Sequence, residues 1–112
     1  MPAGAWTKQF PAAITVCNTE GTILEMNERS ASTFAEDGGS GLVGRNLLDC
    51  HPEPARAKLK QILEEQLTNC YTIEKNGVKK LIYQAPWYEG EQYMGLVELA
   101  IELPAEVPHF IR

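Results

Sequence analysis

The chain has 112 residues, 44% hydrophobic and 22% charged, which is typical of one soluble globular domain. Ten Lys and Arg residues against fifteen Asp and Glu residues give a net charge of −5, which argues against broad nucleic-acid binding. No apolar run approaches the roughly 20 residues that span a bilayer, and the N-terminus lacks a signal-peptide pattern, so a cytoplasmic protein without membrane contact is expected.

The N-terminal part of the chain predicts an arm followed by a hairpin. Residues 1–11 include Trp6 and Phe10 and read as an N-terminal arm or cap helix. Residues 12–18 and 22–27 are rich in β-branched and apolar side chains, and a turn containing glycine separates them. This pattern indicates two short antiparallel strands.

A short helix and a flexible connection are expected next. Asn27 is a favourable N-cap, so residues 28–36 are predicted to be helical. The sequence "DGGSG" at residues 37–41 predicts a flexible link, and it lacks the Lys-Ser/Thr ending of a phosphate loop.

The longest predicted helix lies within residues 52–68, after a short helical turn. Pro52 and Pro54 are compatible only with its lead-in or first turn, where no helical N–H bond is lost. An apolar stripe with spacings of three and four predicts the buried face of this helix: Ala55, Leu59, Ile62, Leu63 and Leu67.

The last third of the chain changes to an alternation of two and predicts three antiparallel strands. Asn76-Gly77 is a strong hairpin signal, and the strands are expected near residues 70–75, 78–87 and 92–103. Uninterrupted alternation in the last strand predicts one face toward the helices and a second, partly apolar face. The inward row is Tyr93, Gly95, Val97, Leu99 and Ile101, and the outward row includes Met94, Leu96 and Ala100.

These elements together predict an α+β fold: a five-stranded antiparallel sheet with short helices and one long helix on one face. Residues 12–103 would form the domain, and residues 104–112 a C-terminal tail. No paired carboxylates and no nucleophile elbow occur, so the chain is not expected to be an enzyme.

Several motifs in order resemble a PAS domain: "NTEGTILEMN" followed by Phe34, then "LVG", then "HPE" at residues 51–53, then "YMGLVELAIEL". The resemblance extends over about residues 12–103. It implies a bacterial-type sensory or interaction module that holds a small ligand or cofactor between sheet and helices. It also implies action on an output domain. No output region follows the last strand, so either a separate signalling partner or a longer parent protein is expected.

Three residues are candidates for contact with a ligand whose identity the sequence does not reveal. His51 precedes the long helix, where a histidine can ligate haem iron, although starting the helix is the favoured role. Gly95 removes a side chain within a strand, so it is expected near the wall of any cavity. Tyr83 is the candidate among the aromatic residues of the last strands, for which core packing is otherwise expected.

The cysteines indicate neither a disulfide framework nor a metal site. Cys17, Cys50 and Cys70 are odd in number, and no CxxC pair occurs. Reduced and mostly buried thiols are expected. Cys50, beside His51 and close to a helix N-terminus, is the better candidate for a reactive thiol.

Three functions therefore stay open: a ligand sensor, a protein-interaction or dimerisation module with a filled core, and a haem or redox sensor using His51 or Cys50. A homodimer is expected through the outer face of the sheet and the arm, with Trp6, Phe10, Met94 and Leu96 in the interface.

Overall fold

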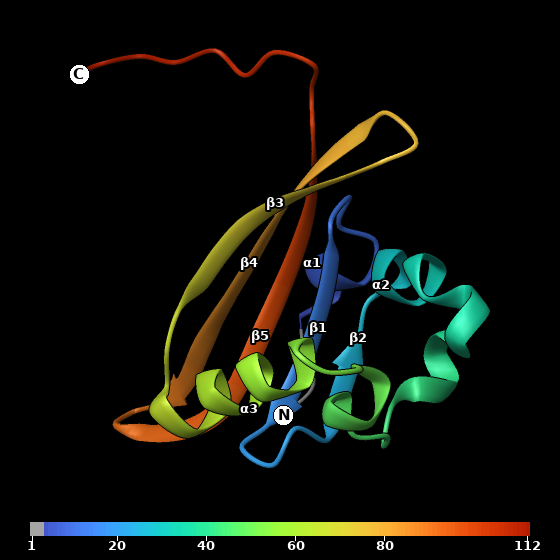
Figure 1. Ribbon diagram of the computed structural model, residues 1–112, viewed down its shortest axis with the longest axis vertical. Coiled ribbons are helices and arrows are strands. Elements are labelled where there is room, and N and C mark those ends of the chain that lie inside the picture. Colours follow the sequence, from blue (N-terminus) through green and yellow to red (C-terminus); the bar gives the residue numbers. More distant parts are fainter. Residues whose placement is uncertain (1–3) are drawn as a thin grey trace.

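A five-stranded antiparallel sheet with the order β2-β1-β5-β4-β3 forms the centre of the structure, a computed structural model that describes residues 4–112 (Figure 1). The bounds are β1 Ala13–Asn18, β2 Ile23–Met26, β3 Asn69–Lys75, β4 Val78–Glu89 and β5 Gln92–Leu103. The predicted α+β fold is confirmed, and the predicted strands differ from these bounds by at most two residues at either end.

Helical elements connect β2 to β3, and one more precedes β1. They are α1 Ala5–Lys8, α2 Glu28–Thr33, η1 Ala35–Asp37, η2 Gly39–Leu42, η3 Leu47–Cys50 and α3 Ala55–Glu65. The glycine-rich segment predicted as a flexible link instead forms the short 3₁₀ turns η1 and η2. Figure 1 shows α3 in front of the lower part of the sheet and α1 behind it. We call the side covered by α3 the inner face and the opposite side the outer face.

The hydrophobic core lies between α3 and the inner face. Leu59, Ile62 and Leu63 of α3 are buried against Cys17 of β1 and Leu96 of β5. The predicted apolar stripe is therefore confirmed at its centre, whereas Ala55 at its start is exposed. Because three residues on one face of α3 are buried, we expect this helix to contribute most to packing stability.

We expect Leu63→Ala to lower the free energy of unfolding by about 2–5 kcal/mol, because it leaves a cavity in this core. Urea denaturation followed by circular dichroism measures the change. Glu64→Ala, at an exposed position one residue later, is the control and should change stability by less than about 0.5 kcal/mol. Equal unfolding midpoints for the two variants would contradict the assignment of this helix face.

A β-bulge in β5 reverses which side chains of that strand face the helices. Trp87 of β4 pairs with Gly95, but the next residue, Tyr88, pairs with Tyr93, so Met94 has no partner. One extra residue in a strand shifts the alternation of its side chains by one position. The uninterrupted alternation predicted for this strand is therefore wrong beyond the bulge.

Leu96 consequently lies on the inner face, where it is 2% exposed and belongs to the core. Its predicted place in an outer interface is wrong. Val97 and Leu99 pair with Val16 and Ile14, residues that alternate along β1 with its buried inner positions. These side chains lie on the outer face, so the inward row predicted beyond Gly95 is also wrong.

Asn27 connects the N-terminal arm, β1 and α2. Its Oδ1 accepts hydrogen bonds from the backbone N–H groups of Ser30 and Ile14, each at 2.9 Å. Its Nδ2 donates to the carbonyls of Thr7 at 3.0 Å and Ala12 at 2.8 Å. The predicted N-cap is confirmed, and the same side chain positions the arm against the domain.

Candidate functional site

A row of polar side chains crosses the inner face beside the hydrophobic core. Asn69 of β3 lies opposite Gln84 of β4, and Gln84 lies opposite Glu98 of β5. Asn69 Nδ2 donates to Gln84 Oε1 at 3.1 Å, and Gln84 Nε2 donates to Glu98 Oε1 at 2.7 Å. Gln84 is 7% exposed, so the centre of the row is fixed by its neighbours. We call these three residues the polar row.

The polar row continues toward α2 through Thr15 of β1, which lies opposite Glu98. The Thr15 and Ser30 hydroxyls are 2.6 Å apart, and both residues are buried. Polar side chains therefore reach from the edge strand β3 to the helix that Asn27 caps. Such groups are retained in an interior only when they are hydrogen-bonded, as these are.

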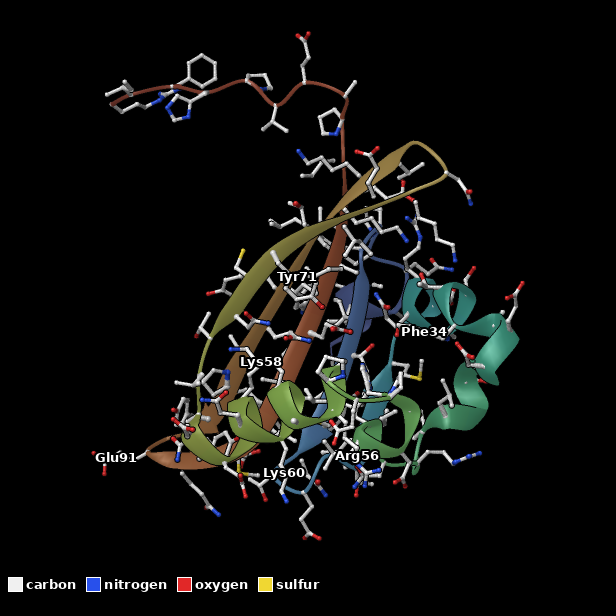
Figure 2. The ribbon with its side chains drawn as sticks, viewed as in Figure 1. Phe34, Arg56, Lys58, Lys60, Tyr71 and Glu91 are labelled. Carbon is white, nitrogen blue, oxygen red and sulfur yellow. The ribbon has the colours of Figure 1, made fainter. Side chains whose placement is uncertain are left out.

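Tyr71 lies over the inner face next to the polar row (Figure 2). Its register partner on the neighbouring strand β4 is Ile82, which is buried. Partial burial raises the pKa of the Tyr71 hydroxyl, and the negative charge of Glu98 raises it further. Ile73, on the same face of β3, is 43% exposed, so this part of the inner face has apolar surface open to solvent.

His51 has a structural contact in this fold. It follows η3 as its C-cap, and its Nδ1 lies 2.7 Å from the carbonyl oxygen of Leu47. A ring nitrogen engaged with a backbone carbonyl fixes the ring orientation. This contact belongs to the end of η3 and not to the start of α3, so the helix-start role and haem ligation by His51 both stay predictions.

Gly95 and Tyr83 do not share a site with the polar row. Gly95 is buried, and a Cβ at its position would overlap the carbonyl oxygen of Cys17 and lie 2.7 Å from the backbone of Asn18. Close approach of β1 to β5 therefore requires this glycine. Tyr83 pairs with Leu99 and is 39% exposed on the outer face, away from the polar row, and its contact with a ligand stays a prediction.

The three cysteines differ in exposure, and the prediction of mostly buried thiols is wrong for two of them. Cys17 is buried in the core, and this burial, chiefly, raises the pKa of its thiol. Cys50 and Cys70 are exposed. The Cys50 thiol donates to the carbonyl of Asn46 at 3.6 Å, and a redox role for it stays a prediction.

The outer face is apolar over β1, β4 and β5, and the arm lies at its edge. Apolar and aromatic side chains on this face include Ile14, Val16, Tyr83, Val97, Leu99 and Ile101. Trp6 and Phe10 are 68% and 45% exposed and pack edge to face with ring centroids 5.7 Å apart. Met94 is half-buried within the bulge. The arm therefore leaves its own aromatic rings uncovered.

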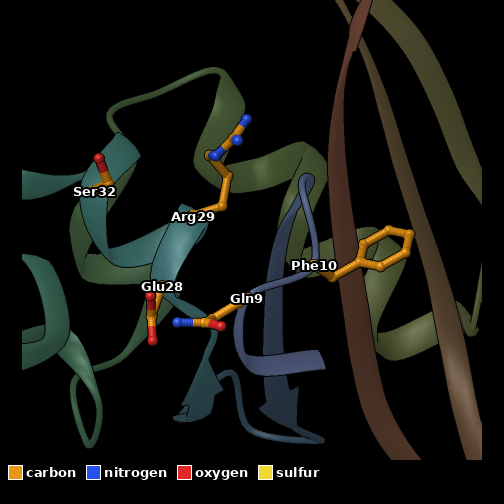
Figure 3. A pocket seen from close by; sticks show the side chains of 5 residues that line it. All are labelled: Gln9, Phe10, Glu28, Arg29 and Ser32. Carbon is orange, nitrogen blue, oxygen red and sulfur yellow. The ribbon is translucent and has the colours of Figure 1, made fainter. Parts of the chain in front are cut away.

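Two open hollows adjoin the arm. Figure 3 shows the first, of about 320 Å³, lined by Gln9, Phe10, Glu28, Arg29 and Ser32. The second, of about 300 Å³, lies between α1 and the outer-face residues Ile14 and Val16. Neither hollow includes a residue of the polar row.

Among residues 4–112, no three or more His, Cys, Asp or Glu side chains gather closely enough to bind a metal ion. No helix in that range has the length and apolar character of a membrane span.

The polar row was not predicted from the sequence, although the hairpin register places two of its three residues. Asn69 and Gln84 lie at equal distances from the Asn76-Gly77 turn, so the hairpin register alone places them opposite each other. Glu98 had no such signal, because the bulge shifts the register of β5 by one residue.

The sequence profile of the PAS fold matches residues 7–77 of the chain. No curated protein sequence matches the chain significantly. Several solved structures of bacterial proteins have a similar fold. A C-terminal domain from Streptococcus mutans is 18% identical with a TM-score of 0.72, covering 91% of this chain and 90% of that chain.

Two structures from Vibrio cholerae are also similar. The VqmA dimer, of the LuxR-type receptors, is 16% identical with a TM-score of 0.66, covering 94% of this chain and 53% of that chain. The Aer2 receptor, a dual PAS-haem oxygen sensor, is 15% identical with a TM-score of 0.59. The match covers 83% of this chain and 95% of that chain. At these identities the likeness shows the fold alone.

Proposed function

The chain belongs to the PAS fold family, and we propose that it is a sensory and protein-interaction module that takes a small ligand on its inner face and pairs with a second copy through its outer face. The family predicted from the sequence motifs is thereby confirmed. One observation is central to the proposal: the two faces of a single sheet differ in chemistry, one with a polar row and the other apolar.

Ligand binding is supported by the inner face beyond α3. The polar row offers fixed hydrogen-bonding groups, and Tyr71 beside it is 42% exposed. Binding sites for small molecules combine apolar and aromatic surface with a few oriented polar groups. The core between α3 and the sheet is closed by Leu96 and its neighbours, so the ligand would contact the sheet above α3.

Dimerisation is supported by the composition of the outer face. Its apolar side chains span neighbouring strands, whereas a sheet face that stays in water is usually polar. Exposed Trp6 and Phe10 extend the apolar surface. VqmA, which has a similar fold, is a dimer. An interface of this kind should bury on the order of 800 Å² per chain.

We expect Leu99→Lys to yield a folded monomer, because it places a charge at the centre of the outer apolar surface without entering the core. Light scattering over a concentration series measures the mass, and circular dichroism checks the fold. Gln61→Lys adds the same charge at an exposed position of α3 and is the matched control, which should stay dimeric. A wild-type mass of one chain up to the highest attainable concentration would exclude the dimer.

A further inference from the structure

Glu98 is a half-buried carboxylate without a cationic partner. Gln84 donates to its Oε1, and within residues 4–112 no Lys, Arg or His forms an ion pair with it. Every fully buried side-chain oxygen or nitrogen in that range has a hydrogen-bond partner. Oε2 of Glu98 accepts no hydrogen bond within that range, so this oxygen is not fully buried.

The groups near Glu98 favour a ligand that donates hydrogen bonds. Asn69 donates to Gln84 and Gln84 to Glu98, so the row directs its donors toward the carboxylate and leaves the acceptor Oε2 at its end. Lys80 shares the inner face but lies opposite Glu102, and it forms no ion pair with Glu98. An anionic ligand would meet the negative charge of Glu98 at short range, which disfavours it.

An aromatic and aliphatic surface adjoins this acceptor. Tyr71 lies over the inner face with Ile82 as its register partner and Ile73 two residues further along β3. Tyr71 is 42% exposed and Ile73 is 43% exposed, so a ligand can reach both side chains from solvent. A cation beside a tyrosine ring and a partly desolvated carboxylate gains from both.

We propose that the inner face binds a small organic cation, an amine or amidine attached to a flat apolar ring, with the ring against Tyr71 and the N–H groups donating to Oε2 of Glu98. This inference rests on the proposed ligand-binding function and specifies its ligand class.

Three probes that share a phenyl ring and differ in charge test the ligand class. Amide shifts of ¹⁵N-labelled protein are followed by NMR during titration with 2-phenylethylamine, 2-phenylethanol and phenylacetate. The amine should bind most tightly, and its largest shifts should fall on β3, β4 and β5 around Tyr71 and Glu98. The amine should exceed the alcohol in affinity by about tenfold, and phenylacetate should bind most weakly.

Substitution of the carboxylate tests the contact. Glu98→Gln keeps the shape of the side chain and an oxygen that can accept from Gln84, but removes the charge. It should lower amine affinity about tenfold, to the level of the alcohol, and leave the alcohol unchanged. Glu102→Gln, on the same strand and exposed, removes the same charge and should leave all three affinities unchanged.

Other outcomes overturn the proposal in distinguishable ways. Equal or tighter binding of phenylacetate on the inner face would refute the cation class while leaving the ligand-binding function in place. Amine binding that Glu98→Gln does not weaken would refute the contact. Absence of inner-face shifts with all three probes up to about 10 mM would overturn this inference, while the dimer measurement still tests the interaction function.

Discussion

Gly95→Ala is expected to lower the free energy of unfolding by more than about 3 kcal/mol. A methyl group at this position would overlap the Cys17 carbonyl of β1, and that obstacle is backbone rather than a flexible side chain. The backbone φ of 141° is in addition one that residues other than glycine rarely adopt. A domain of this size is stable by roughly 5–15 kcal/mol, so the loss is a large fraction of the total.

Gly90→Ala separates these two causes. Gly90 also has a positive φ, of 61°, but a Cβ there meets no atom within 4 Å. Its substitution should therefore cost only the backbone term, about 1–2 kcal/mol. Thermal unfolding of both variants by circular dichroism gives the comparison. If both variants lost a similar amount of unfolding free energy, the added methyl group at Gly95 would not be obstructed by the backbone of β1. That result would contradict the close contact between β1 and β5.

Leu96→Lys is expected to unfold the domain or nearly so. Leu96 is 2% exposed among the core residues of α3 and β1, so the new ammonium group would lose its hydration without gaining a partner. Burial of this kind lowers a lysine pKa by 3–5 units, which corresponds to a cost on the order of 5 kcal/mol. The urea midpoint and the near-ultraviolet circular dichroism report the loss.

Leu99→Lys is the matched comparison on the same strand. Leu99 lies on the outer face, so its substitution should leave the monomer folded. The bulge at Met94 is the reason the two leucines differ, because without it Leu96 would lie on the outer face and Leu99 on the inner one. A stable Leu96→Lys variant together with an unfolded Leu99→Lys variant would mean that β5 lacks the bulge.

Local sequence predicted the parts of the fold that depend on residues close together in the chain. The Asn76-Gly77 turn sets the register of β3 with β4, and Asn27 begins α2 as its N-cap. The apolar spacing of α3 predicted Leu59, Ile62 and Leu63 as core. In each case the determining contacts span a few residues or one hairpin, so the pattern is visible in the sequence.

The candidate site was predictable only in part. Asn69 and Gln84 follow from the hairpin register, but an uninterrupted register from the Glu89–Gln92 pair would place Val97 opposite Gln84. The observed partner is Glu98. The hydrogen bond that completes the polar row therefore exists only because the strand contains an extra residue.

The sequence by itself determined the elements, their order and the packed face of the long helix, because helical and strand periods are local properties. Only the tertiary structure decided which face of β5 is inner. Gly95 lies against the backbone of β1, and Trp87 Nε1 donates to the Cys17 carbonyl at 3.1 Å, so residues far apart in the chain meet at the bulge. Side chains alternate with a period of two, and one extra residue therefore exchanges the core side and the surface side of the strand.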